Sequence, residues 1–275
     1  MPPTSALTSA TAPFAYQTLL TEQVGEHVLV VTLNRPQVRN ALNTQMWHEL
    51  LDLWTRLGAE PGEVRCVVLT GAGEQAFCAG GDLKERDGMT AAVWRHQHAL
   101  IEREYRAMLD FPLPVLAAVN GHAFAGGFEI MLACDFAYAV PGARFALTEV
   151  TLGIMPGAGG TQLLPRAVGE RRAREILLTG KPFSAAQAFE WGALNALCEP
   201  AELLPRVLEV AQTIAGNAPL SVRQAKKSVR FGMQMELQTA LRFEAEAYDH
   251  LVDTDDRLEG VRAFNEKRKP RFLGR

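Results

Sequence analysis

The stretch Ala123–Thr161 places the strongest restrictions on how this chain can fold. Its glycine pair, Gly126 and Gly127, precedes an apolar run with helical spacing, which predicts a loop that turns into a helix. A helix start offers unpaired backbone NH groups and the positive end of the dipole, and both favour a negatively charged oxygen. Glu129 lies in the first turn, and Glu149 follows after an extended run. Two carboxylates beside such a turn indicate proton transfer next to a carbonyl, while a helix-capping Glu129 and a salt-bridged Glu149 are the structural alternatives.

A second glycine loop lies upstream of this stretch. The apolar runs Val28–Leu33 and Val64–Thr70 predict strands, and a helical pattern between them begins at a capping Asn43. Strand, helix and strand at this spacing favour a mostly parallel α/β arrangement. The second strand leads to the glycine loop Phe77–Asp82, and a third strand, Val115–Val119, leads to the first glycine pair. Because α/β proteins usually build their sites on loops that follow strands, we expect both loops to face one pocket.

The C-terminal part of the chain is predicted to be helical. Strand patterns end at about residue 197, whereas helical apolar spacing continues through Glu202–Ala215 and Leu237–Leu251. We therefore divide the chain into a disordered tail (1–13), a core domain (14–200) and a helical region (201–275). The helical region has many apolar residues for a small appendage, which indicates packing on another subunit.

Charge and cysteine content argue against several classes of protein. A net charge of −3 disfavours a nucleic-acid binder, because such proteins carry a basic surplus. The 4 cysteines lie far apart without metal-ligand spacing, so we expect no bound metal and reduced thiols in a cytoplasmic protein. The apolar runs are too short for a membrane helix, and no membrane partner is expected. An RNA-binding protein that uses the arginines around Arg171 with Lys226 and Lys227 is the alternative from a different class.

Two backbone-NH loops, two carboxylates and no metal ligands suit the chemistry of a thioester. Its carbonyl oxygen becomes negatively charged when the α-carbon loses a proton, or when a nucleophile adds to a conjugated double bond. Two NH donors aimed at that oxygen stabilise the enolate, since loss of one such donor commonly costs about 10²- to 10³-fold in rate. Two glutamates can hold a water molecule between them, which is what hydration of a double bond requires.

Five segments carry a family resemblance. They are NRPQVRNAL (Asn34–Leu42), AFCAGGDLKE (Ala76–Glu85), NGHAFAGGFEIMLACD (Asn120–Asp135), FALTEVTLGIMPGAGGTQLLPR (Phe145–Arg166) and EGVRAFNEKRKPRF (Glu259–Phe272). In this order and at this spacing they resemble the enoyl-CoA hydratase/isomerase family, also called the crotonase family, over nearly the whole chain from about Tyr16 to Phe272. Each glycine loop alone is a weak signal, but the five segments together are highly specific.

The resemblance implies an α/β fold in which repeated ββα units wind into a spiral, with a helical C-terminal region that mediates trimers, often paired into hexamers. It implies an enzyme, most like an enoyl-CoA hydratase, that adds water reversibly across the 2,3 double bond of a 2-enoyl-CoA to give a 3-hydroxyacyl-CoA. Coenzyme A is then part of the acyl-CoA thioester substrate, and no separate cofactor is expected. A double-bond isomerase of the same family is the alternative, although isomerases often lose the first of the two acids.

By position, Gly81 and Gly126 match the family's oxyanion-hole residues. Glu129 matches the base toward water, Glu149 matches the acid that protonates the α-carbon, and Gly157 matches a backbone donor beneath the water. The positions that match coenzyme A contacts are Arg39, Ala41, Ala79, Asp82, Leu83 and Lys84, with Phe264 and Lys267 reaching coenzyme A on a neighbouring subunit.

Three features lie outside this match. Many hydratases have alanine where this chain has Gly81, and we expect a looser loop that still works because backbone donation needs no side chain. The residues after Lys84 line the acyl pocket in relatives and vary strongly, which leaves the acyl chain length open. His96 and His98 stand two apart in a predicted helix, and we expect both to be solvated.

Overall fold

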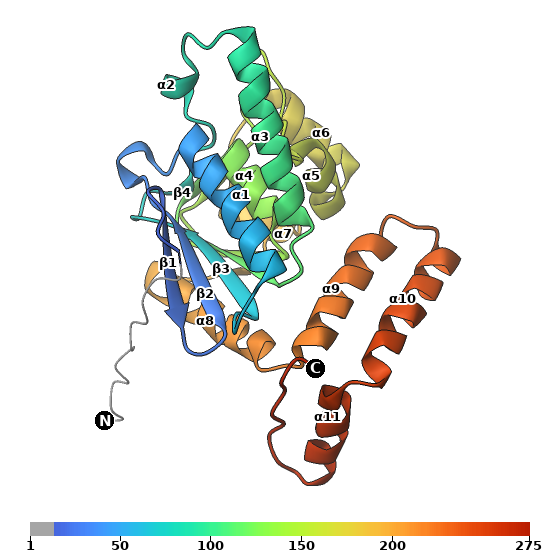
Figure 1. Cartoon of the computed structure of the whole chain (residues 1–275). Helices are drawn as coiled ribbons and strands as arrows, with labels where there is room; N and C mark the ends of the chain where they lie inside the picture. Colours follow the sequence, from blue (N-terminus) through green and yellow to red (C-terminus); the bar gives the residue numbers. More distant parts are fainter. Residues whose placement is uncertain (1–13) are drawn as a thin grey trace.

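The computed structural model describes residues 14–275, so the predicted tail lies outside the described residues (Figure 1). A six-stranded sheet in the order β1-β2-β3-β5-β7-β10 and a four-stranded sheet in the order β4-β6-β8-β9 form its centre. The larger sheet contains β1 (Leu19–Val24), β2 (Val28–Leu33), β3 (Cys66–Gly71), β5 (Val115–Val119), β7 (Phe136–Ala139) and β10 (Ala196–Leu197). The smaller sheet contains β4 (Ala76–Cys78), β6 (His122–Phe124), β8 (Arg144–Ala146) and β9 (Phe183–Ser184).

The chain winds as a spiral of ββα units, as the resemblance implies. Each of the pairs β3–β4, β5–β6 and β7–β8 gives one strand to each sheet, and a helical segment follows each pair. Neighbouring strands are parallel except in the β1–β2 and β8–β9 pairs. The helical segments up to β10 are η1 (Pro36–Val38), α1 (Thr44–Ala59), α2 (Leu83–Arg86), α3 (Ala91–Leu109), α4 (Gly126–Ala133), η2 (Glu149–Leu152), α5 (Gly160–Val168), α6 (Glu170–Thr179) and α7 (Ala185–Glu190).

Local sequence patterns predicted two of these strands and one helix cap. The strands predicted at 28–33 and 115–119 form as β2 and β5, and Asn43 caps α1 by accepting from the Met46 backbone NH. Strand β1 was not predicted; it pairs antiparallel with β2 across a turn at Gly25.

Helices α1 and α3 pack side by side on the large sheet, and α8 (Pro200–Ala215) packs against β2, β3 and β5 (Figure 1). Trp47 and Trp54 of α1 are buried in the core. The Trp54 indole Nε1 donates to the Glu104 carboxyl of α3 at 3.0 Å. Full burial raises the pKa of Glu104 to about 8, so this carboxyl favours its neutral form.

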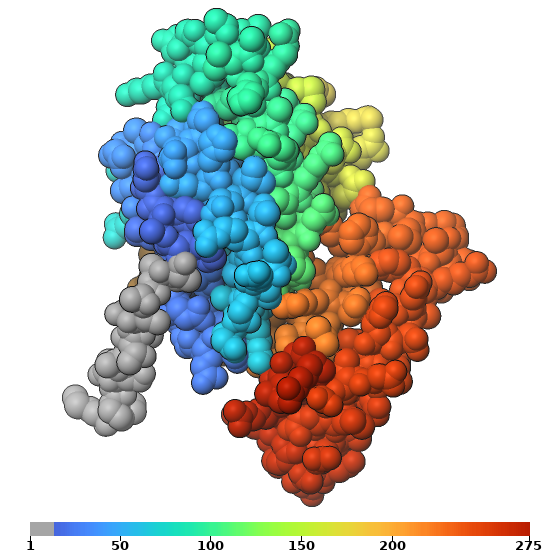
Figure 2. All heavy atoms as spheres, viewed as in Figure 1, coloured from blue at the N-terminus to red at the C-terminus, as the bar shows by residue number. Residues whose placement is uncertain are grey.

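The segment after residue 200 is helical within the described residues, as predicted, and continues with α9 (Pro219–Gly232), α10 (Leu237–Val252) and α11 (Asp255–Asn265). Figures 1 and 2 show these three helices as a lobe beside the core. The Lys226 ammonium ties the lobe to the core by donating to the Leu113 carbonyl and the Asp135 carboxylate, both at 2.7 Å. No helix among residues 14–275 is long and apolar enough to cross a membrane.

The thiols and the basic cluster were also predicted from sequence. Cys66, Cys78, Cys134 and Cys198 are free, as expected. Arg172 and Arg174 pair with Glu175 and Glu170 on the surface of α6, which leaves less of this cluster free for phosphate groups.

Candidate active site

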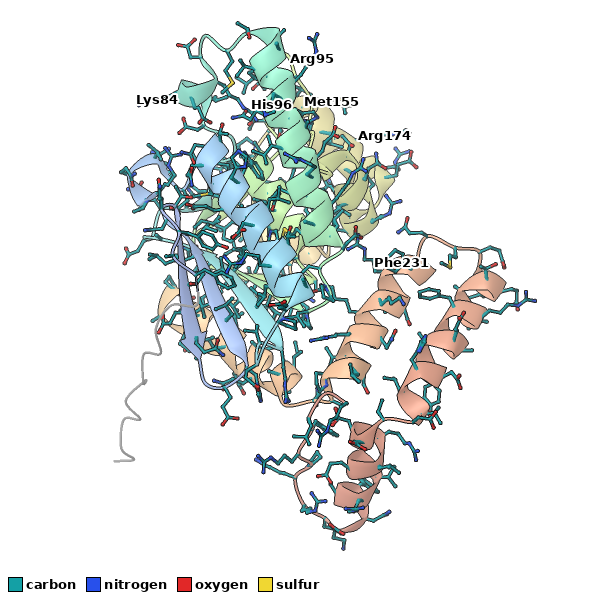
Figure 3. All side chains as sticks on the ribbon, viewed as in Figure 1. Lys84, Arg95, His96, Met155, Arg174 and Phe231 are labelled. Atoms are coloured by element: carbon teal, nitrogen blue, oxygen red, sulfur yellow. The ribbon has the colours of Figure 1, made fainter. Side chains whose placement is uncertain are left out.

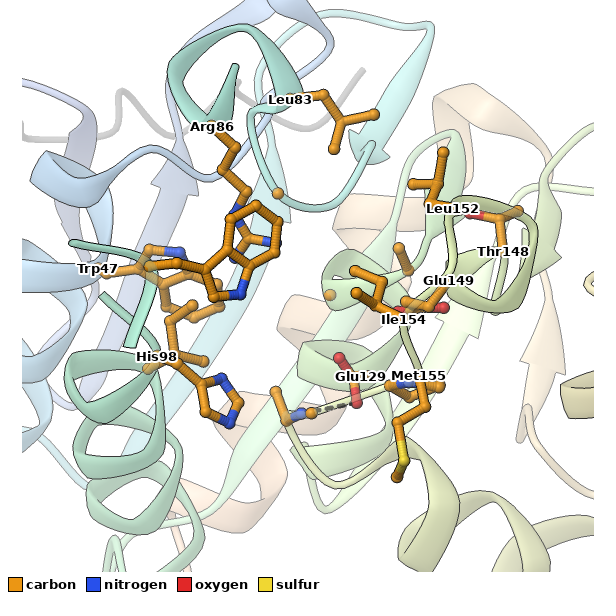
Figure 4. A pocket seen from close by; sticks show the side chains of 18 of the residues that line it. Trp47, Leu83, Arg86, His98, Glu129, Thr148, Glu149, Leu152, Ile154 and Met155 are labelled. Carbon is orange, nitrogen blue, oxygen red and sulfur yellow. Dashed lines mark hydrogen bonds between the residues drawn. The ribbon is translucent and has the colours of Figure 1, made fainter. Parts of the chain in front are cut away.

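A cavity of about 490 Å³ lies where α2, α3, α4 and η2 meet (Figure 4). Its walls include Gly81, Gly126, Glu129, Glu149 and Gly157, which are the five residues assigned catalytic positions from the sequence. Segments far apart in the chain therefore meet in one place, as the two-loop prediction requires.

The backbone NH groups of Gly81 and Gly126 converge on this cavity. A Cβ placed on Gly126 would lie 3.9 Å from the Gly81 nitrogen. Neither NH donates to another group within residues 14–275. Gly126 begins α4, so its NH also carries the positive end of the helix dipole. Two unpaired donors at this spacing can bind one oxyanion.

Tight packing beneath the two donors explains the glycines around them. A Cβ on Gly127 would lie 2.3 Å from the Cys78 carbonyl, so only glycine lets α4 approach β4 this closely. Gly80 has φ +90° and a Cβ there would lie 2.7 Å from the Ala125 Cβ. Ala125 itself has φ 48°, a strained value for alanine that turns the chain into α4.

Glu129 is 3% exposed, and its Oε1 accepts from the backbone NH groups of Ala158 and Gly160, both at 2.8 Å. The side chain thus bonds to Ala158 and to Gly160, the first residue of α5, so Glu129 does not cap its own helix α4. Burial raises the pKa of Glu129 to about 7, and the two NH donors oppose part of that rise.

Glu149 is 7% exposed and begins η2. Its Oε2 is buried without a hydrogen-bond partner, and its carboxylate forms no ion pair within residues 14–275, which contradicts the salt-bridge alternative. Burial raises the pKa of Glu149, and the positive charge of Arg86 opposes the rise. An unpaired buried carboxyl oxygen on a cavity wall is suited to bind a ligand or a water molecule.

Gly157 lines the cavity, but the donors to Glu129 are Ala158 and Gly160, which the sequence interpretation missed. The glycine-rich run Gly157–Gly160 was the sequence signal that could have identified these two donors. His98 also lines the cavity, and a Cβ on Gly157 would lie 2.7 Å from its Cε1. The His98 side chain is nevertheless 44% exposed, and its Nε2 lies 3.4 Å from the Glu102 Oε1, so His98 is partly solvated, as expected, while one edge of its ring faces this loop. His96 is exposed as expected (Figure 3).

Six of the predicted coenzyme A contacts gather beside the cavity. The Arg39 carbonyl accepts from the Ala79 NH at 3.0 Å, and Arg35 bridges the Ala41 carbonyl at 2.7 Å and the Asp82 carboxylate at 2.8 Å. Asp82 also caps α2, on which Leu83 and Lys84 are exposed; Figure 3 shows Lys84. The Asp82 carboxylate thus holds the loop together, and the role of these six residues toward coenzyme A stays a prediction.

Phe264 and Lys267 lie far from these six residues. Phe264 is 84% exposed on α11, and Lys267 follows that helix with φ 55°. Figure 1 shows α11 at the opposite end of the molecule from α2. Within one chain they do not reach the cavity, so a contact with coenzyme A on a neighbouring subunit stays a prediction.

Arg86 is a cavity residue that the motifs did not reveal. It comes from the end of α2 and lies on the wall opposite Glu129 and Glu149 (Figure 4). The only sequence signal for a cavity position of Arg86 was that it follows Lys84, in the segment expected to line the acyl pocket.

Comparisons with known proteins agree with this geometry. The family model of enoyl-CoA hydratase/isomerase matches residues 23–275. The chain is 38% identical over 261 residues to the crotonyl-CoA hydratase of Syntrophomonas wolfei, with 95% of this chain and 100% of that protein covered. It is 41% identical over 242 residues to the short-chain-enoyl-CoA hydratase of Clostridium acetobutylicum, with 88% and 92% covered. A crystal structure of enoyl-CoA hydratase from Bacillus anthracis matches with a TM-score of 0.92 at 43% identity, with 94% and 100% covered. With its two glycine loops and two glutamates on one cavity, the chain belongs to the enoyl-CoA hydratase/isomerase family.

Proposed function

We propose that this protein is an enoyl-CoA hydratase, which adds water reversibly across the 2,3 double bond of a 2-enoyl-CoA to give a 3-hydroxyacyl-CoA. The observation that carries the proposal is the pair of buried glutamates, Glu129 and Glu149, on a cavity that also presents two unpaired NH groups. The names of the hydratases from S. wolfei and C. acetobutylicum support it.

The roles of the site residues follow from where charge develops. The thioester oxygen accepts from the NH groups of Gly81 and Gly126, and a water molecule lies between the two carboxyls. Glu129 takes a proton from this water as its oxygen bonds to the β-carbon, and the π electrons move toward the thioester oxygen. Glu149 then gives a proton to the α-carbon, and one proton returns from Glu129 to Glu149 before the next turnover.

The electrostatic setting suits these roles. A pKa of about 7 makes Glu129 a base that can exist in either state near neutral pH. Burial also raises the pKa of Glu149, which favours the protonated form that an acid needs. The backbone NH groups of Ala158 and Gly160 hold one oxygen of Glu129, so its carboxylate is fixed before substrate binds.

The thioester substrate supplies its own coenzyme A, and we propose no separate cofactor. Arg39, Ala41, Ala79, Asp82, Leu83 and Lys84 hold the coenzyme A moiety in this proposal. Four of them flank Gly81 in the chain, and the segment that contains Arg39 and Ala41 adjoins it through the bridge between Leu42 and Gly81, which supports a thioester position next to the oxyanion donors.

The test is hydration of crotonyl-CoA, followed as loss of the enoyl-thioester absorbance. Glu149→Gln and Glu129→Gln each lower kcat by about 10²- to 10⁴-fold, because general acid and base catalysis contribute that much. Glu22→Gln, at an exposed position on β1, serves as the matched control and keeps the rate. Wild-type turnover in both active-site variants would show that the site is assigned wrongly. Strong activity on a 3-enoyl-CoA that survives loss of Glu129 would support an isomerase instead.

We further propose that the protein assembles as a trimer or hexamer through its helical lobe. Large apolar side chains are exposed along α9–α11: Val229, Met233, Leu237, Tyr248, Val261 and Phe264. An exposed apolar surface of this kind favours association between subunits. Assembly would also bring Phe264 and Lys267 of one subunit to the cavity of another.

A further inference from the structure

The Arg86 guanidinium lies in the cavity without an anionic partner. Its Nε donates to the Gln97 Oε1 at 2.9 Å, but its Nη1 and Nη2 form no hydrogen bond or ion pair within residues 14–275. Glu85, Glu129 and Glu149 all act on it electrostatically, yet none forms an ion pair with it. Because neither terminal nitrogen is bound to a protein group, the guanidinium can donate from both to an anion that enters the cavity.

The surroundings hold this guanidinium in place. Gln97 is buried, and its Nε2 donates to the Thr44 hydroxyl at 2.8 Å and to the Glu85 carboxylate at 3.0 Å. The Arg86 guanidinium also packs over the Trp94 ring, with its carbon 4.7 Å from the ring centroid. Neither contact neutralises the charge, so the side chain is fixed while its terminal nitrogens stay available.

Gly81 makes room for the guanidinium beside the oxyanion donors. A Cβ on Gly81 would lie 3.1 Å from the Arg86 Cζ and 3.2 Å from Nη1. An alanine there would force the guanidinium to move by a few tenths of an ångström. The missing side chain at Gly81 and the position of Arg86 are therefore linked. The guanidinium therefore lies in the same cavity as the two NH groups that bind the thioester oxygen in our proposal.

The charged side chains on the cavity wall favour one kind of acyl group over another. The cavity contains Glu129 and Glu149, whose negative charges repel an anionic substrate. The positive charge of the Arg86 guanidinium, which lies against Gly81, opposes this repulsion. A neutral alkyl chain would leave the guanidinium desolvated and unpaired. A carboxylate can accept from both terminal nitrogens in the two-pronged geometry that arginine favours.

We propose that Arg86 binds a carboxylate at the far end of the acyl group, so that the preferred substrates are CoA monothioesters of short unsaturated dicarboxylic acids. This inference rests on the proposed hydratase function and specifies the substrate class of the same cavity. Arg86 is then the residue that determines specificity, and the double bond is still hydrated by the glutamate pair.

The test compares two substrates with the same carbon chain. One is the CoA monothioester of pent-2-enedioic acid, and the other is pent-2-enoyl-CoA, which ends in a methyl group. The wild type has the higher kcat/KM on the dicarboxylic substrate. In Arg86→Gln the ratio of the two kcat/KM values falls by about 10- to 100-fold, as expected for loss of a charge-assisted hydrogen-bond pair. Arg86→Lys keeps part of the ratio.

Two further variants separate specificity from a general effect of charge. Arg103→Gln removes the same charge from an exposed position on α3 outside the cavity wall and keeps the wild-type ratio. Gly81→Ala lowers the ratio in the same direction as Arg86→Gln, because its Cβ displaces the guanidinium. If Arg86→Gln lowers both kcat/KM values by the same factor, Arg86 acts only on the charge of the glutamates and the inference is overturned.

A binding measurement keeps this inference distinct from the proposed function. Calorimetry with the unreactive saturated pair, glutaryl-CoA and pentanoyl-CoA, gives the ratio of Kd values without turnover. An Arg86-dependent preference for glutaryl-CoA supports the carboxylate site even if no enoyl-CoA is hydrated, a result that would count against the hydratase proposal alone. Hydration of pent-2-enoyl-CoA combined with no preference for the dicarboxylic partner in either assay overturns the inference and leaves the hydratase proposal intact.

Discussion

Glu129 and Glu149 have different surroundings although they face one cavity. Two backbone NH groups bind one oxygen of Glu129, whereas the Glu149 Oε2 is buried without a partner. Each carboxyl also feels the Arg86 charge, and Glu149 raises the pKa of Glu129. The pair therefore titrates as a coupled unit in which one proton is the working state.

The pH dependence of kcat/KM tests this coupling. The proposed reaction needs Glu129 ionised and Glu149 protonated, so activity falls at low pH when the pair gains a second proton. Because the pKa of about 7 belongs to Glu129, which must be ionised to act as the base, activity rises with pH through about 7, and it falls again at higher pH when Glu149 loses its proton. A bell-shaped profile for crotonyl-CoA hydration with its lower limb near pH 7 is the expected result. Glu104→Gln should keep this profile because Glu104 does not line the cavity, and a profile that stays flat from about pH 5 to about pH 9 would contradict the model.

At the scale of elements, the site depends on how closely α4 approaches β4 and on how α1 packs against α3. The first contact brings together the loops that carry Gly81 and Gly126. The second encloses Glu104 and Trp54 beneath the cavity wall formed by α3. Each contact can be probed with one substitution.

Gly127→Ala tests the contact between α4 and β4. Alanine favours a helix over glycine by about 1 kcal/mol, but its Cβ would lie 2.3 Å from the Cys78 carbonyl. The clash should dominate, with a net loss of about 1–3 kcal/mol in the free energy of unfolding and at least about a 10-fold loss in kcat/KM. Gly142→Ala is the control, because a Cβ there meets nothing within 4 Å. Equal urea midpoints for the two variants would show that the close approach is not needed.

Glu104→Gln tests the contact between α1 and α3. The folded pKa of about 8 lies above the usual value of 4.5, so the stability contributed by the neutral carboxyl is fully present below pH 4.5 and is lost as pH rises through 8. Glutamine cannot ionise. The variant should therefore gain stability over the wild type between about pH 5 and about pH 9, by about 1.4 kcal/mol for each unit of pKa difference. Urea unfolding at both pH values measures this gain, with exposed Glu102→Gln as control; a pH-independent difference would refute the assignment.

At the scale of the whole molecule, the core and the helical lobe differ in what they bury. The sheets and the helices up to α8 enclose the hydrophobic core, whereas α9 and α10 pack mainly on each other and leave large apolar side chains exposed. Figure 2 shows the lobe extending beside the core. The exposed apolar side chains of the lobe are the contact surface in the oligomer that we propose.

Analytical ultracentrifugation tests this assembly. The protein should sediment at three or six times the 30.1 kDa chain mass. The double variant Val229→Asp and Met233→Asp should shift the population toward the single-chain mass, because buried unpaired carboxylates oppose association. Leu20→Asp, at an exposed apolar position on β1, is the control and should keep the assembly. A wild type that sediments as a monomer at micromolar concentration would rule out the proposed oligomer.

Local patterns in the sequence were sufficient for much of the fold and for the reacting groups. Strands such as 28–33 and the Asn43 cap depend on neighbouring residues, so periodicity and side-chain chemistry could predict them. The glycine loops and the glutamate pair were likewise identified from their order and spacing. Strand β1 was missed because the consecutive polar residues Thr21, Glu22 and Gln23 interrupt its apolar run, and its pairing with β2 is what makes it a strand.

The sequence by itself determined which residues could do chemistry, namely two glutamates and two glycine-rich turns. Only the tertiary structure decided their environment. Ala158 and Gly160 bind Glu129, His98 reaches Gly157, and Arg86 lies against Gly81 through contacts between separate segments of the chain. Burial and through-space charge set the pKa of each carboxyl, and neither can be read from a linear pattern. For the same reason, the role of Arg86, which selects the acyl group in our proposal, could be inferred only from the folded chain.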